Sequence, residues 1–313
     1  MTLALVTGGA GFIGSHIVDE LLAKNLEVRV IDNLSTGNRD HLAHVEGEIE
    51  FVEGDINDSQ TMAKVVQNAD LVFHQAALAS VPLSLEKPLV VHQACATGTL
   101  AVLEHAKNAG VQRVIYAASS SCYGDQPFSA KRESDRLNPL SPYAAAKLAG
   151  EMYCQAYYHS FGLETVGIRY FNVFGPRQDP NSPYSAVIPL FITRMLAGEQ
   201  PTIFGDGYQS RDFTFVQNVV AGNMAAATAE NVGGQVFNIA DGRSTDLLTL
   251  IECLNKLLGT AIEPAHHPPR SGDVRESLAD ISKAVDELGY QPQVRFEEGL
   301  EQSVDYYRSI IDR

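Results

Sequence analysis

Short apolar runs alternate with longer stretches of helical spacing through the first half of this 313-residue chain. The runs are too short for helices and are typical of buried parallel strands, which we expect at 3–6, 27–31, 50–52, 71–74, 111–117 and 165–169. Between them, apolar residues recur at helical spacing, and we expect helices at 16–24, 89–109 and 142–161. Alternation at this rhythm predicts an α/β fold with a doubly wound parallel sheet.

The second half of the chain is less regular and predicts a smaller α/β lobe. A loop is expected at 175–184, which is rich in Pro, Gly, Asn and Asp. Strands are expected at 202–204, 211–216 and 236–239, and helices at 187–196, 247–258, 281–288 and 296–311. No long linker separates the halves. We therefore expect two interleaved units, a sheet domain of residues 1–170 plus about 212–240 and a lobe of about 171–211 and 241–313.

Glycines interrupt the chain between the first strand and the first helix, in the stretch TGGAGFIG. Gly8 permits a tight turn, Gly11 lets backbone approach a pyrophosphate, and Gly14 lets the helix pack closely. A GxxGxxG spacing also occurs in ordinary strand–helix turns. Asp32, however, ends the second strand, where a carboxylate accepts hydrogen bonds from the ribose hydroxyls of adenosine and repels a 2′-phosphate. Together these residues predict a Rossmann-type domain that binds NAD rather than NADP.

Polar or small residues lie just at the ends of five of the expected strands. They are Asp32, Asp55, Ala76, Ser119 and Tyr170. In an open parallel sheet the ligand binds outside the carboxyl ends of the strands. We therefore expect these five residues to face one cleft.

Composition narrows the function classes. A net charge of −15 disfavours non-specific binding to nucleic acid or an anionic membrane. The four cysteines (Cys95, Cys122, Cys154 and Cys253) have neither CxxC nor metal-ligand spacing, so we expect a reducing compartment and no metal. No signal peptide and no membrane-spanning stretch is evident, and we expect a cytoplasmic protein.

Candidate acid–base chemistry lies at the start of the expected helix 142–161. Tyr143 and Lys147 are four residues apart and share a helix face. The ammonium favours the phenolate of Tyr143 and can also reach ribose hydroxyls, so Tyr143 can act as a base. A YxxxK pair is common by itself. Here it follows a dinucleotide-binding pattern and a serine cluster in which a hydroxyl could bridge a substrate oxygen and Tyr143.

Taken together, these motifs resemble the extended short-chain dehydrogenase/reductase superfamily, and within it the nucleotide-sugar 4-epimerases. The resemblance covers nearly the whole chain, through TGGAGFIGSH, DNLSTG, GDI, HQAA, SSSCYG, SPYAAAKLAGE, RYFNVFGPRQ, PYSAVIP, FGDGYQSRDF and SGDVRESLADISKA. It implies a bound NAD, a UDP-sugar substrate held by the smaller lobe, and a homodimer formed through helices 89–109 and 142–161.

The resemblance also implies roles for individual residues. The catalytic set would be Tyr143 as the base, Lys147 as its partner and Ser119 as the assisting hydroxyl. Cofactor binding would fall to Gly8, Gly11, Phe12, Ile13, Asp32, Asn33, Ser35, Thr36, Gly37, Asp55, Ile56, Ala76, Ala77, Tyr143, Lys147 and Tyr170. Substrate binding would fall to Ser80, Ser119, Ser120, Ser121, Tyr143, Asn172, Ala186, Val187, Arg211, Arg270, Asp273 and Ser277. One departure is Cys95, where the family usually has Asn.

The implied reaction is 4-epimerisation of a UDP-hexose through a transient 4-keto sugar. Related dehydratases carry an Asp-Glu pair, and related decarboxylases a Glu, in the stretch that here reads Ser120-Ser121, so both fit less well. A uronic-acid 4-epimerase would share the same catalytic set, whereas a non-catalytic NAD-sensing regulator often lacks the Tyr or the Lys. Ser277 stands where many epimerases restricted to plain hexoses carry Tyr, so we expect the N-acetylated sugars to be accepted as well.

Overall fold

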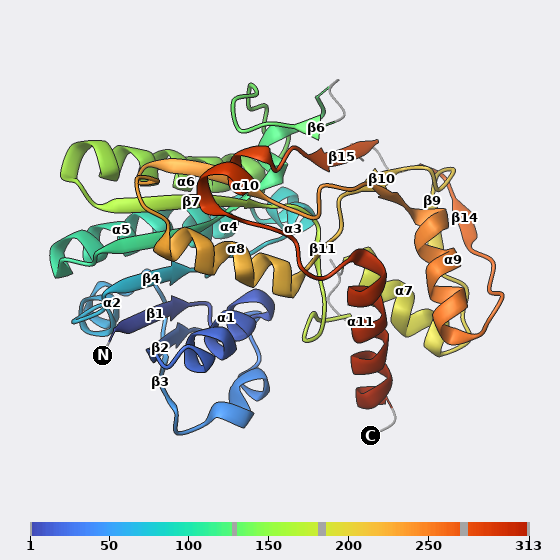
Figure 1. Cartoon of the computed structure of the whole chain (residues 1–313), viewed down its shortest axis with the longest axis horizontal. Coiled ribbons are helices and arrows are strands. Elements are labelled where there is room, and N and C mark those ends of the chain that lie inside the picture. The colour runs from blue at the N-terminus through green and yellow to red at the C-terminus, as the bar shows by residue number, and fades with distance from the viewer. Residues whose placement is uncertain (1, 127–129, 181–185, 270–274, 312–313) are drawn as a thin grey trace.

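A seven-stranded parallel sheet lies at the centre of the larger part of the molecule (Figure 1). The computed structural model describes residues 2–126, 130–180, 186–269 and 275–311. The strand order is β12-β7-β5-β4-β1-β2-β3, the doubly wound order that the alternation predicted. The strands are β1 (Leu3–Thr7), β2 (Glu27–Asp32), β3 (Ile49–Glu53), β4 (Leu71–His74), β5 (Arg113–Ser119), β7 (Glu164–Tyr170) and β12 (Gln235–Ile239).

Two helical layers cover the two faces of this sheet. One core joins the sheet to α1, α8 and α10, and the other joins it to α2, α5 and α6. Strand β1 shows why its apolar run is continuous, because Ala4 and Val6 enter the first core while Leu5 enters the second. The helices are α1 (Phe12–Ala23), α2 (Ser59–Val65), α5 (Gly98–Ala109), α6 (Pro142–Phe161), α8 (Val216–Thr228) and α10 (Ser282–Leu288).

Helix α6 has the bounds that the sequence predicted. The Ser141 side chain caps it by accepting a hydrogen bond from the Ala144 N–H, and Pro142 occupies the first turn. Gly162 ends it in the left-handed conformation at φ 72°. The caps fix where α6 begins, and that start places Tyr143 and Lys147 beside the ends of the strands.

The stretch expected to be helical at 89–109 is helical throughout, but the prediction is wrong for a single regular α-helix. A short helix α4 (Pro88–His92) follows α3 (Val81–Glu86), and a π-helical turn, η2 (Gln93–Thr97), separates α4 from α5. The turn widens the helix by one residue, and the Thr99 hydroxyl donates to the Cys95 carbonyl at 2.6 Å. The apolar spacing on either side of the turn is helical, so the sequence pattern does not reveal the break.

The expected strand at 211–216 is also wrong as a single element. It divides into β10 (Ser210–Arg211) and β11 (Thr214–Phe215), and the chain then enters α8 at Val216. Helices α2 and α8 were not predicted. The apolar run before α8 has the pattern of one strand. In the structure, however, Phe215 pairs with β8 and the next residue, Val216, is the first of α8.

The smaller lobe stands beside the carboxyl ends of the sheet strands (Figure 1). Its core is aromatic, and Phe174 packs against Phe213, Phe215 and Phe296. The lobe and its connections contain α7 (Val187–Leu196), α9 (Leu247–Leu258), α11 (Phe296–Ile311), β6 (Ala130–Lys131), β8 (Val173–Phe174), β9 (Thr202–Phe204), β13 (Thr245–Asp246), β14 (Ala265–His267) and β15 (Glu276–Ala279). Two short 3-10 helices, η1 (Arg39–Val45) and η3 (Ser120–Tyr123), complete the described elements. None of the helices within these ranges is long and apolar enough to cross a membrane.

Candidate active site

The glycine turn after β1 has the geometry that close approach of a phosphate requires. Gly8 has a φ of 70°, and a Cβ on it would lie 2.7 Å from the Ala76 nitrogen. A Cβ on Gly14 would collide with the Gly8 carbonyl oxygen, so only glycine lets α1 begin this close to the turn. Helix α1 starts after Gly11 without a side-chain cap and without an acidic residue in its first turn. Its first N–H groups therefore suit a phosphate ligand.

Asp32 lies buried at the end of β2, beside this turn. Its carboxylate accepts hydrogen bonds from the Ala10 N–H at 2.9 Å and the Leu34 N–H at 2.8 Å. Burial raises the pKa of Asp32, and the two backbone donors oppose the change. Gly37 passes so near that a Cβ there would lie 2.9 Å from the carboxylate oxygens. The carboxylate is thus fixed in direction, as recognition of a ribose diol requires.

The next strand end contributes a second acidic residue. The Asn33 side chain donates to Asp55 at 2.9 Å, and Asn57 donates twice to the same carboxylate, at 2.8 and 2.9 Å. Burial acts to raise the pKa of Asp55, but these hydrogen bonds outweigh it and hold the pKa below its usual value. The Ser35 N–H donates to Asn33 at 3.1 Å. Asn33, Ser35 and Asp55 therefore form one connected edge of the site.

A buried hydrogen-bonded chain supports the loop after β4. The Ala76 N–H donates to the Thr7 hydroxyl at 3.3 Å, which lies 2.7 Å from His74 Nδ1. His74 Nε2 lies 3.0 Å from the Thr99 hydroxyl, whose own proton goes to Cys95. This order assigns the proton to Nε2 and makes Nδ1 the acceptor from Thr7.

Tyr143 lies at the start of α6, with its side chain close to that of Ser119 at the end of β5. The Ser119 hydroxyl lies 2.8 Å from that of Ser121 and also accepts from the Ser121 N–H at 3.2 Å. Burial raises the pKa of Tyr143 above its ordinary value, while the Ser119 hydrogen bond lowers it. The structure thus brings Ser119 of the serine cluster close to Tyr143, and the roles expected of the two side chains stay predictions.

Lys147 lies one turn further along α6 and is 3% exposed. Its ammonium lies 4.5 Å from the centre of the Tyr116 ring and forms no ion pair with a residue in the described ranges. Burial lowers the pKa of Lys147. A buried ammonium with hydrogen-bonding capacity to spare suits the hydroxyls of a bound ribose.

Tyr170 closes the cleft at the end of β7. Its hydroxyl lies 3.1 Å from Gln75 Oε1 and 2.9 Å from Asn223 Nδ2, so two amides hold the ring in place. Burial raises the pKa of Tyr170. Sequence reasoning did not identify Gln75 or Asn223, although Gln75 directly follows a strand and could have been found by the strand-end argument.

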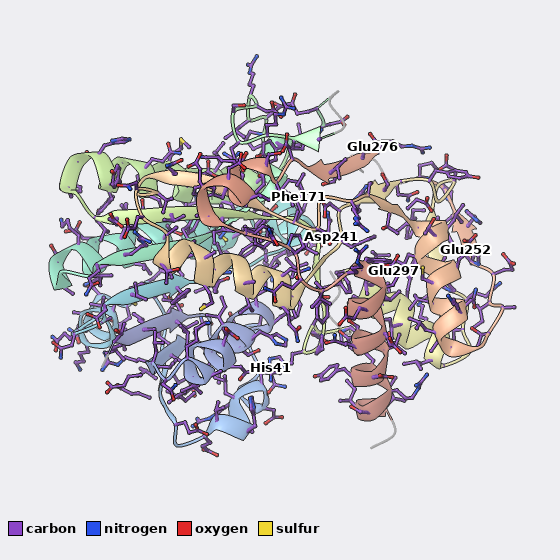
Figure 2. All side chains as sticks on the ribbon, in the orientation of Figure 1. His41, Phe171, Asp241, Glu252, Glu276 and Glu297 are labelled. Atoms are coloured by element: carbon purple, nitrogen blue, oxygen red, sulfur yellow. The ribbon has the colours of Figure 1, made fainter. Side chains whose placement is uncertain are left out.

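A cavity of about 200 Å³ lies in the smaller lobe, and its lining begins at Asn172, just after β7 of the sheet domain. Four expected substrate residues line it, namely Asn172, Ala186, Val187 and Arg211. Figure 2 labels Phe171 and Asp241, which follow β7 and β12 and lie toward the smaller lobe, where these two parts meet. Sequence reasoning missed Gln209, Phe213 and Leu247, which also line the cavity. They were missed because an apolar or amide side chain in an irregular stretch has no distinctive pattern.

Ser277 lies half-buried on β15, in register with Arg211 on β10. The adjoining Asp212 holds the two strands together, since its N–H donates to the Ser277 carbonyl at 2.6 Å and its carboxylate accepts from the Ala279 N–H at 3.2 Å. Burial raises the pKa of Asp212 to about 7. Ser277 therefore occupies a firmly held position beside an expected phosphate-binding arginine.

The other expected residues are placed as follows. Ser80 caps α3 by accepting from the Leu83 N–H at 3.1 Å, and Ser120 begins η3. Phe12 and Ile13 open α1, Thr36 is exposed in the loop after β2, Ile56 is buried against α2 and α5, and Ala77 packs beside Tyr143. Arg270 and Asp273 lie outside the described residues. No group of three His, Cys, Asp or Glu side chains within the described ranges could hold a metal ion.

Comparison with known proteins gives one family and a consistent set of folds. The family model described as "NAD dependent epimerase/dehydratase family" matches residues 4–240. A UDP-glucose 4-epimerase from Thermotoga maritima, solved with UDP-glucose, is 39% identical, with a TM-score of 0.94 and coverage of 99% of this chain and 100% of that chain.

Two further solved structures extend this set. A UDP-N-acetylglucosamine 4-epimerase from Methanobrevibacter ruminantium, in complex with UDP-N-acetylmuramic acid, is 41% identical, with a TM-score of 0.94 and coverage of 99% of both chains. A UDP-glucuronic acid 4-epimerase from Bacillus cereus, in complex with UDP-glucuronic acid and NAD, is 33% identical, with a TM-score of 0.92 and coverage of 99% of this chain and all of that one. All three resemble the chain over nearly its full length.

Proposed function

The chain belongs to the NAD dependent epimerase/dehydratase family, and from that premise we propose that it is a UDP-sugar 4-epimerase. NAD is its cofactor, in keeping with the glycine turn and the buried Asp32. The observation that carries the proposal is the placement of Tyr143, close to Ser119 and one turn from the buried Lys147. No carboxyl side chain stands at 119–121, where an elimination or decarboxylation would use one.

The proposed roles follow from these contacts. Tyr143 accepts the proton of the sugar 4-hydroxyl and returns it after the ring has turned over, with Ser119 relaying between the two oxygens. When bound, NAD would accept the hydride from C4 of the sugar and return it to the same carbon, so the net redox change would be zero. Lys147 holds the ribose and keeps a positive charge near Tyr143, which favours the phenolate.

The substrate proposed is a UDP-hexose, both the glucose/galactose pair and its N-acetylated counterpart. The cavity of the smaller lobe, with Arg211 at its wall, supports a nucleoside diphosphate, because a guanidinium binds phosphate oxygens in pairs. Arg270 and Asp273 belong to the same proposal on sequence grounds. The N-acetylated pair is included because Ser277, a small side chain, is in register with Arg211 in the β10–β15 pair, at the position where the sequence comparison expects a larger side chain in enzymes restricted to plain hexoses.

Substitution of Ser277 tests this specificity. Ser277→Tyr should abolish turnover of UDP-N-acetylglucosamine and leave UDP-galactose within a few-fold, because overpacking a closed site excludes the larger ligand. Ser282→Tyr, at the start of α10, is the control for an added ring elsewhere. Equal slowing of the plain and the N-acetylated UDP-hexoses would show that Ser277 does not determine which sugars are accepted.

A second candidate is a UDP-uronic acid 4-epimerase, because a relative of that activity is 33% identical over almost the whole chain. Chromatography of reactions with UDP-glucose, UDP-galactose, their N-acetyl forms and UDP-glucuronic acid separates the candidates without added reductant. Conversion of the uronic form alone would replace the main proposal.

Tyr143→Phe tests the acid–base mechanism that both candidate 4-epimerase functions share. The variant should keep NAD and lose about 10²–10⁴-fold in rate, the usual contribution of a positioned acid–base group. Tyr306→Phe on α11 is the matched control and should be fully active. Wild-type turnover by a folded Tyr143→Phe protein would refute the mechanism.

A homodimer is part of the proposal. Helices α3, α4 and α6 pack together and carry exposed apolar side chains, with Leu85 66%, Leu89 82%, Val90 51% and Met152 43% exposed. A second copy would cover them. Leu89→Glu with Met152→Glu should give a monomer by light scattering, and a wild-type monomer would contradict the proposal.

The domain division and location are also proposed. We assign residues 1–170 and about 212–240 to NAD binding and the remainder to the lobe, except that α10 packs on the sheet domain. The four cysteines are free thiols, which suits the cytoplasm.

A further inference from the structure

Lys147 has no anionic partner among the residues that the structure describes. The groups that face it are His74 on β4, Tyr116 on β5, Cys95 in the π-helical turn and Cys154 on α6. All four are neutral in their ordinary states. Burial lowers the pKa of Lys147. The charge on this ammonium therefore depends on weaker stabilisation than an ion pair provides.

Tyr116 contacts Lys147 in two different ways. Its hydroxyl donates to the Lys147 carbonyl at 3.0 Å, which ties β5 to the backbone of α6. Its ring face lies 4.5 Å from the Lys147 ammonium, within the range of a cation–π interaction. One side chain thus fixes both the backbone and the charged end of the lysine.

The Tyr116 ring is itself held without freedom to move. It is fully buried, and the His74 ring packs beside it at 5.7 Å between centres. On α6, Gly150 leaves the space for its hydroxyl, because a Cβ at Gly150 would collide with that oxygen. The ring is a rigid support rather than filler that could repack.

We infer that Tyr116 is a positioning residue for the reaction: it holds Lys147 in place through its hydroxyl and stabilises the lysine charge through its ring. The inference rests on the proposed function for the role of Lys147, and it concerns a residue outside the expected catalytic set. It assigns separate effects to the two parts of one side chain, and these effects can be tested separately.

The sign of the effect follows from the chemistry. Without the aromatic face the ammonium loses stabilisation, so Lys147 gives up its proton at lower pH. NAD binding and turnover both need the charged lysine. Loss of the Tyr116 ring should therefore move the basic limb of each pH profile to lower pH. A desolvated cation–π contact corresponds to about one pKa unit, which sets the expected shift at about one pH unit.

Three variants separate the contributions. Tyr116→Leu removes ring and hydroxyl, whereas Tyr116→Phe keeps the ring. Tyr290→Phe is the matched control, since Tyr290 is also buried and its hydroxyl donates to a backbone carbonyl, that of Ala240, at 2.9 Å. All three lose a buried tyrosine hydroxyl, and only Tyr116→Leu loses the aromatic face under Lys147.

The first measurement does not depend on turnover. The NAD-dependent rise in the midpoint of thermal unfolding is followed between pH 6 and 10 for each holoprotein. In Tyr116→Leu the rise should disappear at a pH about one unit lower than in the wild type. Tyr116→Phe and Tyr290→Phe should keep the wild-type profile. Equal profiles for the Leu and Phe variants would overturn the inference.

The second measurement is the pH profile of kcat on the best sugar from the substrate screen. The same one-unit shift is expected for Tyr116→Leu, with rescue by Tyr116→Phe. If Tyr116→Leu does not fold, Gly150→Ala displaces the ring with both side chains retained, and an unshifted profile there would refute the role. Absence of turnover on every sugar would instead count against the proposed function and leave the NAD profiles to decide on Tyr116.

Discussion

His74→Gln should make the protein less sensitive to acid. The native protein holds His74 as a neutral imidazole, with Thr7 and Thr99 on its two nitrogens and only 1% of its surface exposed. Burial, and then the charge of Lys147, lowers its pKa from 6.5 to about 3. Glutamine also offers one donor and one acceptor, but it does not bind a proton in this range.

The magnitude follows from proton linkage. The unfolded chain binds a proton at His74 below pH 6.5, whereas the folded chain does so only near pH 3. Stability from this residue is therefore fully present above pH 6.5 and falls as the pH is lowered toward 3. Between pH 7.5 and 5.0 the loss is about 2 kcal/mol, since one pKa unit is about 1.4 kcal/mol and the unfolded histidine titrates over about 1.5 units in that interval.

Urea unfolding at the two pH values measures this difference directly. At pH 7.5 the variant should be the less stable protein, because glutamine does not fill the ring's space. That deficit should shrink by about 2 kcal/mol at pH 5.0. Other titrating groups, His16 included, are common to both proteins and cancel. His159→Gln, an exposed site on α6, is the control. A deficit that is equal at both pH values would refute the reasoning.

Three further predictions concern the same elements. Gly14→Ala should abolish NAD retention in a protein that still folds, because its Cβ would force the turn open against Gly8, and NAD released on denaturation provides the check. Asp32→Asn should weaken the binding of NAD at least tenfold and reduce the preference of the protein for NAD over NADP, because the carboxylate that binds the ribose diol is lost. Thermal shift with each nucleotide measures both effects, and an unchanged preference would contradict the prediction. Arg169→Met should destabilise the fold by about 3–5 kcal/mol in urea, since it leaves the buried Glu151 unpaired, and a loss below 1 kcal/mol would contradict it.

The strand-end argument explains why so much of the site could be predicted. Strand bounds within one or two residues were enough, because parallel strands in the order found bring their carboxyl ends to one edge. Asp32, Asp55, Ala76, Ser119 and Tyr170 all lie at that edge, as expected from the sequence. The argument needs only the element type and its end, both of which the apolar pattern predicts well.

The π-helical turn could not be predicted for a physical reason. The turn shifts the apolar positions of the helix by one residue. A shift of that size lies within the normal variation of the apolar stripe on a helix. The turn nevertheless places Cys95 beside Lys147 and supplies the carbonyl that receives the Thr99 proton. Features that depend on a tertiary hydrogen bond lie beyond what periodicity can show.

The sequence around Lys147 would suggest an ion pair with Glu151, but in the structure Glu151 pairs with Arg169. Glu151 lies four positions further along α6, a spacing at which lysine and glutamate commonly pair on one helix face. In the structure Arg169 of β7 takes both oxygens of Glu151, at 2.9 and 2.6 Å, and both residues are buried. A guanidinium that binds two oxygens outcompetes a single ammonium for a carboxylate. Among the described residues Lys147 therefore has no carboxylate partner, because Arg169 holds Glu151. In the proposed mechanism this leaves the ammonium available to NAD, so the Arg169–Glu151 pair would support the chemistry as well as the fold.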